Sequence, residues 1–120
     1  MGNERRILIA EDEAFSAMWL ELELTRAGFS VLPPVASGED AVETARRHRP
    51  DLLLMDIRLA GEMDGIDAAG EIRATYACDV VFMTGYSDPE LRERANRLAP
   101  LSYMTKPIHI AELKHTITTQ

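Results

Sequence analysis

The stretch Asp51-Leu52-Leu53-Leu54-Met55-Asp56 decides the fold of this chain. Its four apolar residues lack the polar alternation of a half-buried strand, so the stretch predicts a short strand that is buried on both faces. Such strands lie in the centre of parallel sheets that helices cover on both sides. The strand ends on Asp56, which would lie at the sheet edge where open α/β proteins bind their ligands. An Asp that only begins the following turn is the alternative interpretation.

Four further strands are predicted from short apolar runs, at residues 7–10, 29–35, 80–83 and 101–104. Helical patterns lie between and after the strands, at residues 14–27, 37–48, 66–75, 87–98 and 110–118. Pro33 and Pro34 cannot donate hydrogen bonds within a sheet, so the second strand belongs on an edge. The alternation predicts a three-layer α/β/α sandwich, a flavodoxin-like fold whose five-stranded parallel sheet has the order 2-1-3-4-5.

Composition and charge narrow the class of protein. The length predicts a single domain over residues 1–120, and the net charge of −7 argues against direct binding of nucleic acid. The single cysteine, Cys78, excludes an internal disulfide, and no cluster of histidines and cysteines offers zinc ligands. There is no signal peptide and no apolar stretch of membrane-spanning length. These features predict a cytoplasmic protein that meets a basic or polar protein partner and no membrane.

Polar residues follow the predicted strands at one edge of the sheet. Glu11 and Asp12 follow the first strand, Asp56 ends the third, and Thr84 and Lys106 follow the fourth and fifth. Three carboxylates in one crevice repel one another, and a divalent cation with oxygen ligands, such as Mg²⁺, would compensate them. A hydroxyl and an ammonium beside them would neutralise the oxygens of a phosphoryl group. The set predicts phosphoryl transfer onto Asp56.

The chain resembles the receiver domains of bacterial response regulators over essentially its whole length. The resemblance is carried by Glu11-Asp12, Asp56 after Leu-Leu-Leu-Met, Met63-Asp64-Gly65, Thr84-Gly85, Tyr103 and Lys106-Pro107. It implies a switch in two-component signalling, in which a histidine kinase or histidine phosphotransfer protein phosphorylates Asp56. It also implies that Asp12 and Asp56 bind Mg²⁺, that Glu11 helps through water, and that the backbone carbonyl of Arg58 completes the coordination.

The same resemblance assigns the remaining site residues. Thr84 and Lys106 would bind the phosphoryl oxygens, and Tyr103 would swing inward when Thr84 moves toward the phosphate. An ordinary core aromatic is the alternative interpretation of Tyr103. Arg58 and Tyr86 would flank the path of the water that hydrolyses the acyl phosphate, and we hypothesise that they shield it. The loop before Asp64-Gly65 has one residue more than the commonest spacing, which leaves its path open.

Two other functions compete with the switch. The first is a phosphatase or phosphotransferase with an aspartyl nucleophile, but such enzymes need an acid two residues after the nucleophile, where this chain has Arg58. The second is a degenerate receiver that only binds partners, against which the complete set of acceptor-site residues argues. The sequence therefore predicts a regulatory phosphoacceptor that is not an enzyme.

The first helix carries apolar residues on two faces. One face holds Ala17, Leu20, Leu24 and Ala27, and the opposite face holds Phe15, Met18, Trp19 and Leu22. Only one face can meet the sheet. One interpretation is that the last helix covers part of the other face. The remainder is predicted to be a partner surface, for the helical bundle of a kinase or for a second copy in a homodimer. The arginines of the fourth helix, Arg92, Arg94 and Arg97, are predicted to form a solvated face.

Overall fold

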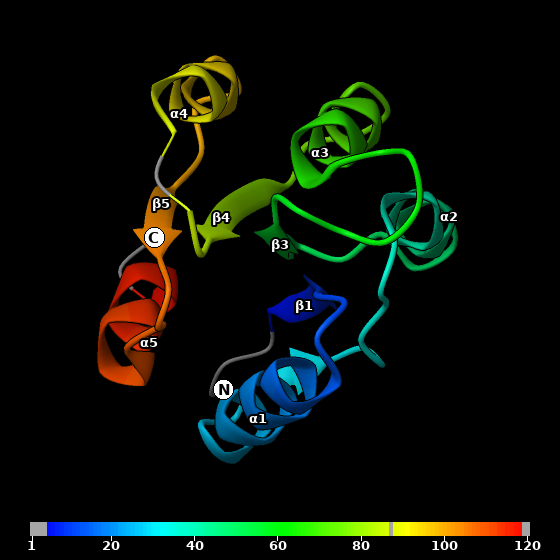
Figure 1. Ribbon diagram of the computed structural model, residues 1–120. Helices are drawn as coiled ribbons and strands as arrows, with labels where there is room; N and C mark the ends of the chain where they lie inside the picture. The colour runs from blue at the N-terminus through cyan, green and yellow to red at the C-terminus, as the bar shows by residue number, and fades with distance from the viewer. Residues whose placement is uncertain (1–4, 87, 119–120) are drawn as a thin grey trace.

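Strands and helices alternate strictly along the chain (Figure 1). The computed structural model describes residues 5–86 and 88–118. The elements are β1 (Arg6–Ala10), α1 (Ala14–Arg26), β2 (Ser30–Val31), α2 (Gly38–His48), β3 (Leu52–Asp56), α3 (Gly65–Arg73), β4 (Asp79–Thr84), α4 (Pro89–Asn96), β5 (Ser102–Thr105) and α5 (Ile110–Thr118). The five strands are parallel, and their order is β2-β1-β3-β4-β5. The predicted fold class is confirmed.

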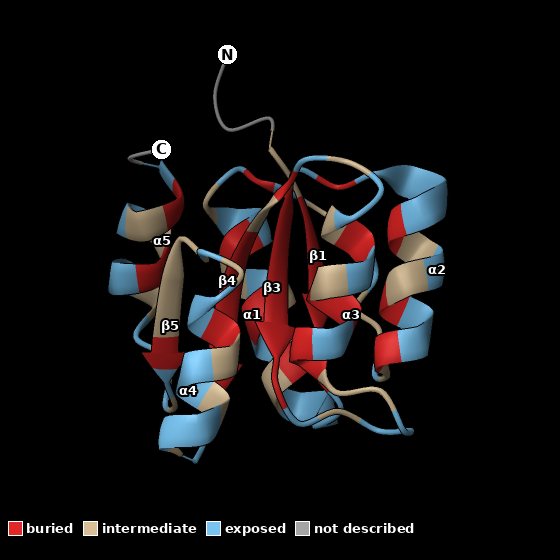
Figure 2. Ribbon diagram, turned by 90° about the horizontal axis from the view of Figure 1, so that it is seen from above, coloured by how far each residue is buried: buried red, intermediate tan, exposed pale blue. Residues whose placement is uncertain are grey.

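The central strand β3 is buried along its whole length, as the apolar run predicts. Figure 2 shows it between β1 and β4, which are also buried almost throughout. Alternate strand residues point to two separate apolar cores. One core packs against α1 and α5, and the other against α2, α3 and α4, which lie on the opposite side of the sheet (Figure 1).

Strand β2 lies on the predicted edge but is shorter than residues 29–35. The chain still follows β1 beyond Val31, because Leu32 N–H donates to the Ile7 carbonyl and Val35 N–H to the Ile9 carbonyl, both at 2.9 Å. Pro33 and Pro34 lie between these two bonds and have no N–H to donate. The regular pairing therefore stops at Val31, and the predicted length of this strand was wrong.

The helix boundaries lie within two residues of the predicted ones, and the caps explain where the helices begin. The side chains of Glu13, Ser37, Asp64 and Asp88 each accept a backbone N–H in the first turn of the following helix. The predicted start of α4 at Ser87 lies outside the described residues. Among the described residues, no helix has the length and apolar character that crossing a membrane requires.

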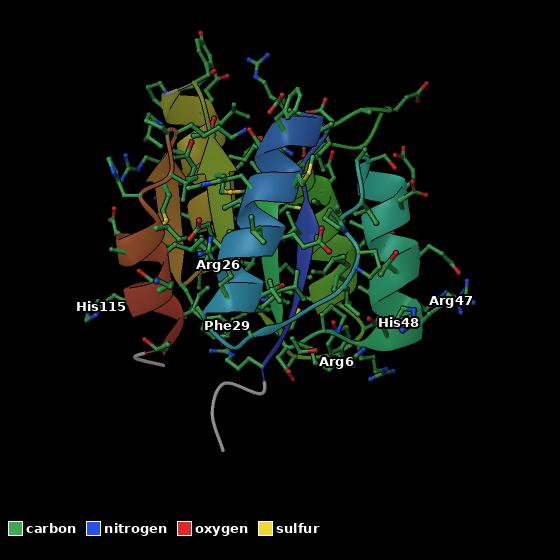
Figure 3. The ribbon with its side chains drawn as sticks, turned by 90° about the horizontal axis from the view of Figure 1, so that it is seen from below. Arg6, Arg26, Phe29, Arg47, His48 and His115 are labelled. Carbon is green, nitrogen blue, oxygen red and sulfur yellow. The ribbon has the colours of Figure 1, made fainter. Side chains whose placement is uncertain are left out.

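Charge is distributed unevenly between the two ends of the molecule. In a parallel α/β fold, the N-termini of all helices lie at the edge where the strands end. Acidic residues lie at these N-termini: Glu13, Glu39, Asp40, Asp64, Asp67, Asp88, Glu90 and Glu112. Basic residues lie in the last turns: Arg26, Arg46, Arg47, His48, Arg73, Arg94 and His115. Figure 3 shows Arg6, Arg47 and His48 toward the end that carries the helix C-termini. Acidic residues at helix N-termini and basic residues at helix C-termini interact favourably with the helix dipole. The edge at which the strands end is therefore the acidic edge of the molecule.

Candidate functional site

An open cavity of about 470 Å³ lies at the acidic edge of the sheet. It is lined by Glu11, Asp12, Glu13, Asp56, Arg58, Leu59, Gly85, Tyr86 and Lys106. These residues follow β1, β3, β4 and β5, so the topology brings together segments that are far apart in sequence. Six predicted site residues line this one cavity: Glu11, Asp12, Asp56, Arg58, Tyr86 and Lys106.

Lys106 joins the two buried carboxylates of the cavity. Its Nζ lies 2.7 Å from Glu11 Oε1 and 2.6 Å from Asp56 Oδ2. Glu11 and Asp56 are only 3% and 4% exposed, so without a counter-charge they would be costly to ionise. Desolvation lowers the pKa of Lys106, but the hydrogen bonds to Asp56 and Glu11 outweigh it and raise the pKa above its ordinary value. Lys106 therefore stays a cation between these carboxylates.

Three carboxylates of the cavity are placed to hold a cation. Glu11, Asp12 and Asp56 can each offer one oxygen, and these oxygens lie within 4.8 Å of one another. Desolvation raises the pKa of Glu11, partly offset by its hydrogen bond from Lys106. Asp12 is exposed, which leaves room for water on that side. Oxygen ligands beside open solvent suit Mg²⁺, which keeps several of its waters in protein sites.

The buried Thr84 hydroxyl does not face the cavity. Thr84 Oγ1 donates to the Tyr86 carbonyl at 2.8 Å and accepts the Tyr86 N–H at 3.1 Å. Both bonds tie the hydroxyl to the loop that leads into α4. The predicted contact of Thr84 with a phosphoryl group therefore requires the hydroxyl to leave these partners.

Tyr103 lies on the same face of the sheet as Thr84. In the parallel register of β4 and β5, Tyr103 pairs with Phe82 and Thr105 pairs with Thr84. The Tyr103 ring is half-buried beneath the guanidinium of Arg92, whose Cζ lies 5.0 Å from the ring centroid. The Tyr103 hydroxyl is buried and has no hydrogen-bond partner among the described residues. Desolvation raises the pKa of this hydroxyl.

Arg58 and Tyr86 meet at the mouth of the cavity. The Arg58 Cζ lies 4.9 Å from the centroid of the Tyr86 ring, in the geometry of a cation–π contact. Arg58 follows β3 and Tyr86 follows β4, so the pair bridges the two loops beside Asp56. The sequence predicted that these two residues act together beside Asp56, but it gave no sign that they stack.

The loop after Asp56 was left open by the sequence, and the structure gives its path. It runs outward to the segment that precedes α2, where Ala60 N–H donates to the Ala36 carbonyl at 3.2 Å, and returns at Gly65. Gly65 N–H donates to the Ile57 carbonyl at 2.8 Å. A Cβ at Gly65 would lie 2.1 Å from the Asp56 carbonyl oxygen, so only glycine fits at this position.

We expect Gly65→Ala to lower the free energy of unfolding by about 1–3 kcal/mol, because the new methyl group collides with the backbone of Asp56. Urea unfolding measures the loss. Gly70→Ala is the matched control in the same helix. A Cβ at Gly70 meets nothing within 4 Å, so this change should preserve or increase stability. Equal stability of the two variants would contradict the close approach at Gly65.

Arg94 in α4 differs from the predicted solvated face. Arg94 Nη1 lies 3.0 Å from Asp64 Oδ2, and its Nη2 lies 3.0 Å from Asp67 Oδ1. Burial raises the pKa of Asp64, but the Asp67 N–H and Arg94 outweigh it and lower the pKa below its ordinary value. The prediction was wrong for Arg94, whereas Arg92 and Arg97 are exposed as predicted, with Arg92 lying over the Tyr103 ring. No sequence pattern marks these contacts, since the partners are about thirty residues away in the chain.

The two faces of α1 are separated as predicted. Ala17, Leu20 and Leu24 are buried, whereas Ala27 is only half-buried. On the opposite face the exposed fractions are 78% for Phe15, 56% for Met18, 42% for Trp19 and 53% for Leu22. These four side chains remain largely exposed, so the last helix, α5, does not cover this face as a whole, and Trp19 is the least exposed of the four.

Comparisons with known proteins agree with this geometry. Residues 7–118 match the response regulator receiver domain family. The transcriptional regulatory protein PdtaR of Mycobacterium tuberculosis is 40% identical over 109 residues, which are 91% of this chain and 53% of PdtaR. The phyllosphere-induced regulator PhyR of Methylorubrum extorquens is 34% identical over 93% of this chain and 42% of PhyR. The chain thus spans about half the length of these relatives.

Solved structures give the same result. The signal receiver domain of a modulated diguanylate cyclase from Desulfovibrio desulfuricans superposes with a TM-score of 0.91 and 34% identity. The superposition covers 98% of this chain and 93% of that one. Family match, relatives and structural neighbours all lead to one conclusion: this chain belongs to the response regulator receiver domain family of two-component systems.

Proposed function

We propose that Asp56 accepts a phosphoryl group from the phosphohistidine of a histidine kinase or histidine phosphotransfer protein. The observation that carries this proposal is the buried Asp56 carboxylate at the base of an open cavity, held by Lys106 at 2.6 Å beside two further carboxylates. A buried acid in this setting is accessible from one side only. A donor must therefore approach through the mouth of the cavity.

The transfer forms one bond and breaks one bond. A carboxylate oxygen of Asp56 attacks phosphorus, the phosphorus–nitrogen bond of the donor breaks, and its electron pair returns to the imidazole. Glu11, Asp12, Asp56 and the Arg58 carbonyl are the proposed ligands or water partners of Mg²⁺, which would neutralise charge on the phosphoryl oxygens. Lys106 lies within hydrogen-bond distance of Asp56, so it can follow the new phosphoryl oxygens.

The proposed readout begins at Thr84. Its hydroxyl would leave the Tyr86 backbone and donate to a phosphoryl oxygen, which frees space on the face that Tyr103 shares. Tyr103 would then turn inward. The alternative function, an aspartyl phosphatase, gains no support at the position two residues after Asp56, where Arg58 stacks on Tyr86.

Mass spectrometry after incubation with acetyl phosphate and Mg²⁺ tests the proposal. We expect one phosphoryl adduct, which forms poorly when EDTA removes the metal and which hydroxylamine cleaves, as it does acyl phosphates. An adduct that resists hydroxylamine would place the phosphate on another kind of residue. No adduct under any of these conditions would contradict the proposed acceptor function.

The outer face of α1 is the proposed partner surface of this reaction. Phe15, Met18, Trp19 and Leu22 form one exposed apolar stripe, and α1 begins directly beside the cavity. Glu21 and Glu23 lie on either side of the stripe at about 100° per residue. Apolar contacts with acidic flanks suit a helical partner with an apolar face and basic edges.

We expect Met18→Glu to slow phosphotransfer from the cognate kinase several-fold, because a charge would be buried in the docked stripe. Labelling by acetyl phosphate, which needs no docking, should be unchanged. Thr25→Glu adds the same charge to the exposed surface of α1 further from the cavity, and serves as the control. Equal slowing by both donors would mean that Met18 supports the fold and not the docking.

A further inference from the structure

Helix α4 is attached to the rest of the molecule by a small apolar contact and by its arginines. Ala95 is the one fully buried residue of the eight in α4, and Leu91 packs against the same core while only partly buried, so the apolar contact of this helix is small. Arg94 makes ion pairs with Asp64 and Asp67, and Arg92 lies over Tyr103. Polar contacts therefore contribute much of what fixes the position of α4 against α3 and β5.

The α3 side of the Arg94 contact is held by several backbone contacts. Asp64 caps α3, and its Oδ1 accepts the Asp67 N–H at 2.8 Å. The next residue, Gly65, is pressed against the carbonyl of Asp56 and bonded to Ile57. Asp64 is therefore held against the end of β3, the strand that carries Asp56, and the ion pair of Arg94 with Asp64 connects α4 to this position.

The α4 side of the contact is coupled to Thr84. The Thr84 hydroxyl is bonded to the backbone of Tyr86, three residues before α4 begins at Pro89. Turning this hydroxyl toward the cavity removes both bonds and releases the segment that leads into α4. Because Tyr86 and α4 are close neighbours in the chain, we expect a shift of the Tyr86 backbone to be opposed when α4 is held in place.

We infer that Arg94 is a positioning residue that holds α4, and through it Thr84, in the resting arrangement. The inference rests on the proposed acceptor function. Arg92 also holds the resting arrangement, because it lies over the Tyr103 ring. The buried Tyr103 hydroxyl has no hydrogen-bond partner among the described residues, so the hydroxyl itself does not stabilise the resting position of the ring. A receiver without the Arg94 ion pairs would enter the phosphorylated arrangement at lower cost.

Binding of beryllofluoride, a phosphoryl mimic, in the presence of Mg²⁺ tests this inference without any covalent step. Nuclear magnetic resonance titration of ¹⁵N-labelled protein gives the half-saturating concentration for wild type and variants. We expect Arg94→Ala to lower this concentration by about three- to tenfold, because two ion pairs no longer oppose the transition. Asp67→Asn, which leaves the Asp64 cap intact, should lower it less, and adding it to Arg94→Ala should change nothing further.

Arg97→Ala is the matched control. Arg97 directly follows the last residue of α4 and carries the same charge as Arg94. Among the described residues, its ion-pair partner is Glu93 of α4, at 3.7 Å. The Arg97→Ala protein should have the same half-saturating concentration of beryllofluoride as wild type. The concentration for Arg94→Lys should lie between those of wild type and Arg94→Ala. Unchanged or weaker binding by Arg94→Ala would overturn the inference. Failure of the wild type to bind would instead contradict the proposed acceptor function.

Discussion

An Asp56→Asn protein is expected to take up no phosphoryl label from acetyl phosphate in the presence of Mg²⁺. The amide has no anionic oxygen to attack phosphorus, and the acyl phosphate cannot form. Asn keeps the shape of the side chain, and its carbonyl oxygen can still accept the Arg58 N–H that now bonds Asp56 Oδ1 at 3.1 Å. The fold should therefore survive, which circular dichroism checks, and the loss should be chemical.

Asp51, at the opposite end of β3 from Asp56, supplies a matched control. Asp51 precedes β3, is exposed, and accepts the Arg6 N–H at 2.8 Å at the edge opposite the cavity. Asp51→Asn removes the same charge and should label as wild type does. If Asp56→Asn labels equally well, the acceptor lies elsewhere. If Asp51→Asn also loses its label, the effect reflects charge or folding and not the acceptor.

Sequence alone predicted the parts of this protein that depend on local pattern. The unbroken apolar run before Asp56 fixed a central strand, and the prolines at 33 and 34 fixed an edge strand. Because the strands are parallel, the carboxyl ends of β1, β3 and β5 lie along the same edge of the sheet. That is why Glu11, Asp12, Asp56 and Lys106 could be grouped before any geometry was known, and the structure brings them into one cavity.

Side-chain orientation and long-range pairing could not be predicted in the same way. The Thr84 hydroxyl can turn to the cavity or to its own loop, and a sequence does not distinguish these rotamers. Arg94 could equally have faced solvent, since its partners Asp64 and Asp67 belong to another helix. The stacking of Arg58 on Tyr86 has the same origin, because it depends on how two loops lie beside each other.

That stacking leads to the second large effect that we expect. Water hydrolyses an acyl phosphate by attacking phosphorus in line, from the side opposite Asp56, which is the mouth of the cavity. Arg58 and Tyr86 lie at this mouth, with the Arg58 Cζ 4.9 Å from the centroid of the Tyr86 ring. The Tyr86 side chain is 54% exposed. Arg58 cannot act as a base toward water, and its charge can pair with phosphoryl oxygens. Replacing both residues by Ala should therefore speed decay of the phosphorylated protein about tenfold, equivalent to about 1.4 kcal/mol of barrier.

The decay is followed in Mg²⁺ after the phosphodonor has been removed. Because the two side chains support each other, each single Ala variant should already show most of the effect, and the two effects should not add. Arg49 stacks on Tyr76 at 5.1 Å toward the opposite edge, so Arg49→Asn tests the loss of a similar pair far from the cavity. Asn is chosen because Arg49 has a positive φ of 47°, which Asn tolerates. Unchanged or slower decay in the double variant would exclude shielding, and faster decay in Arg49→Asn would point to a general loss of rigidity.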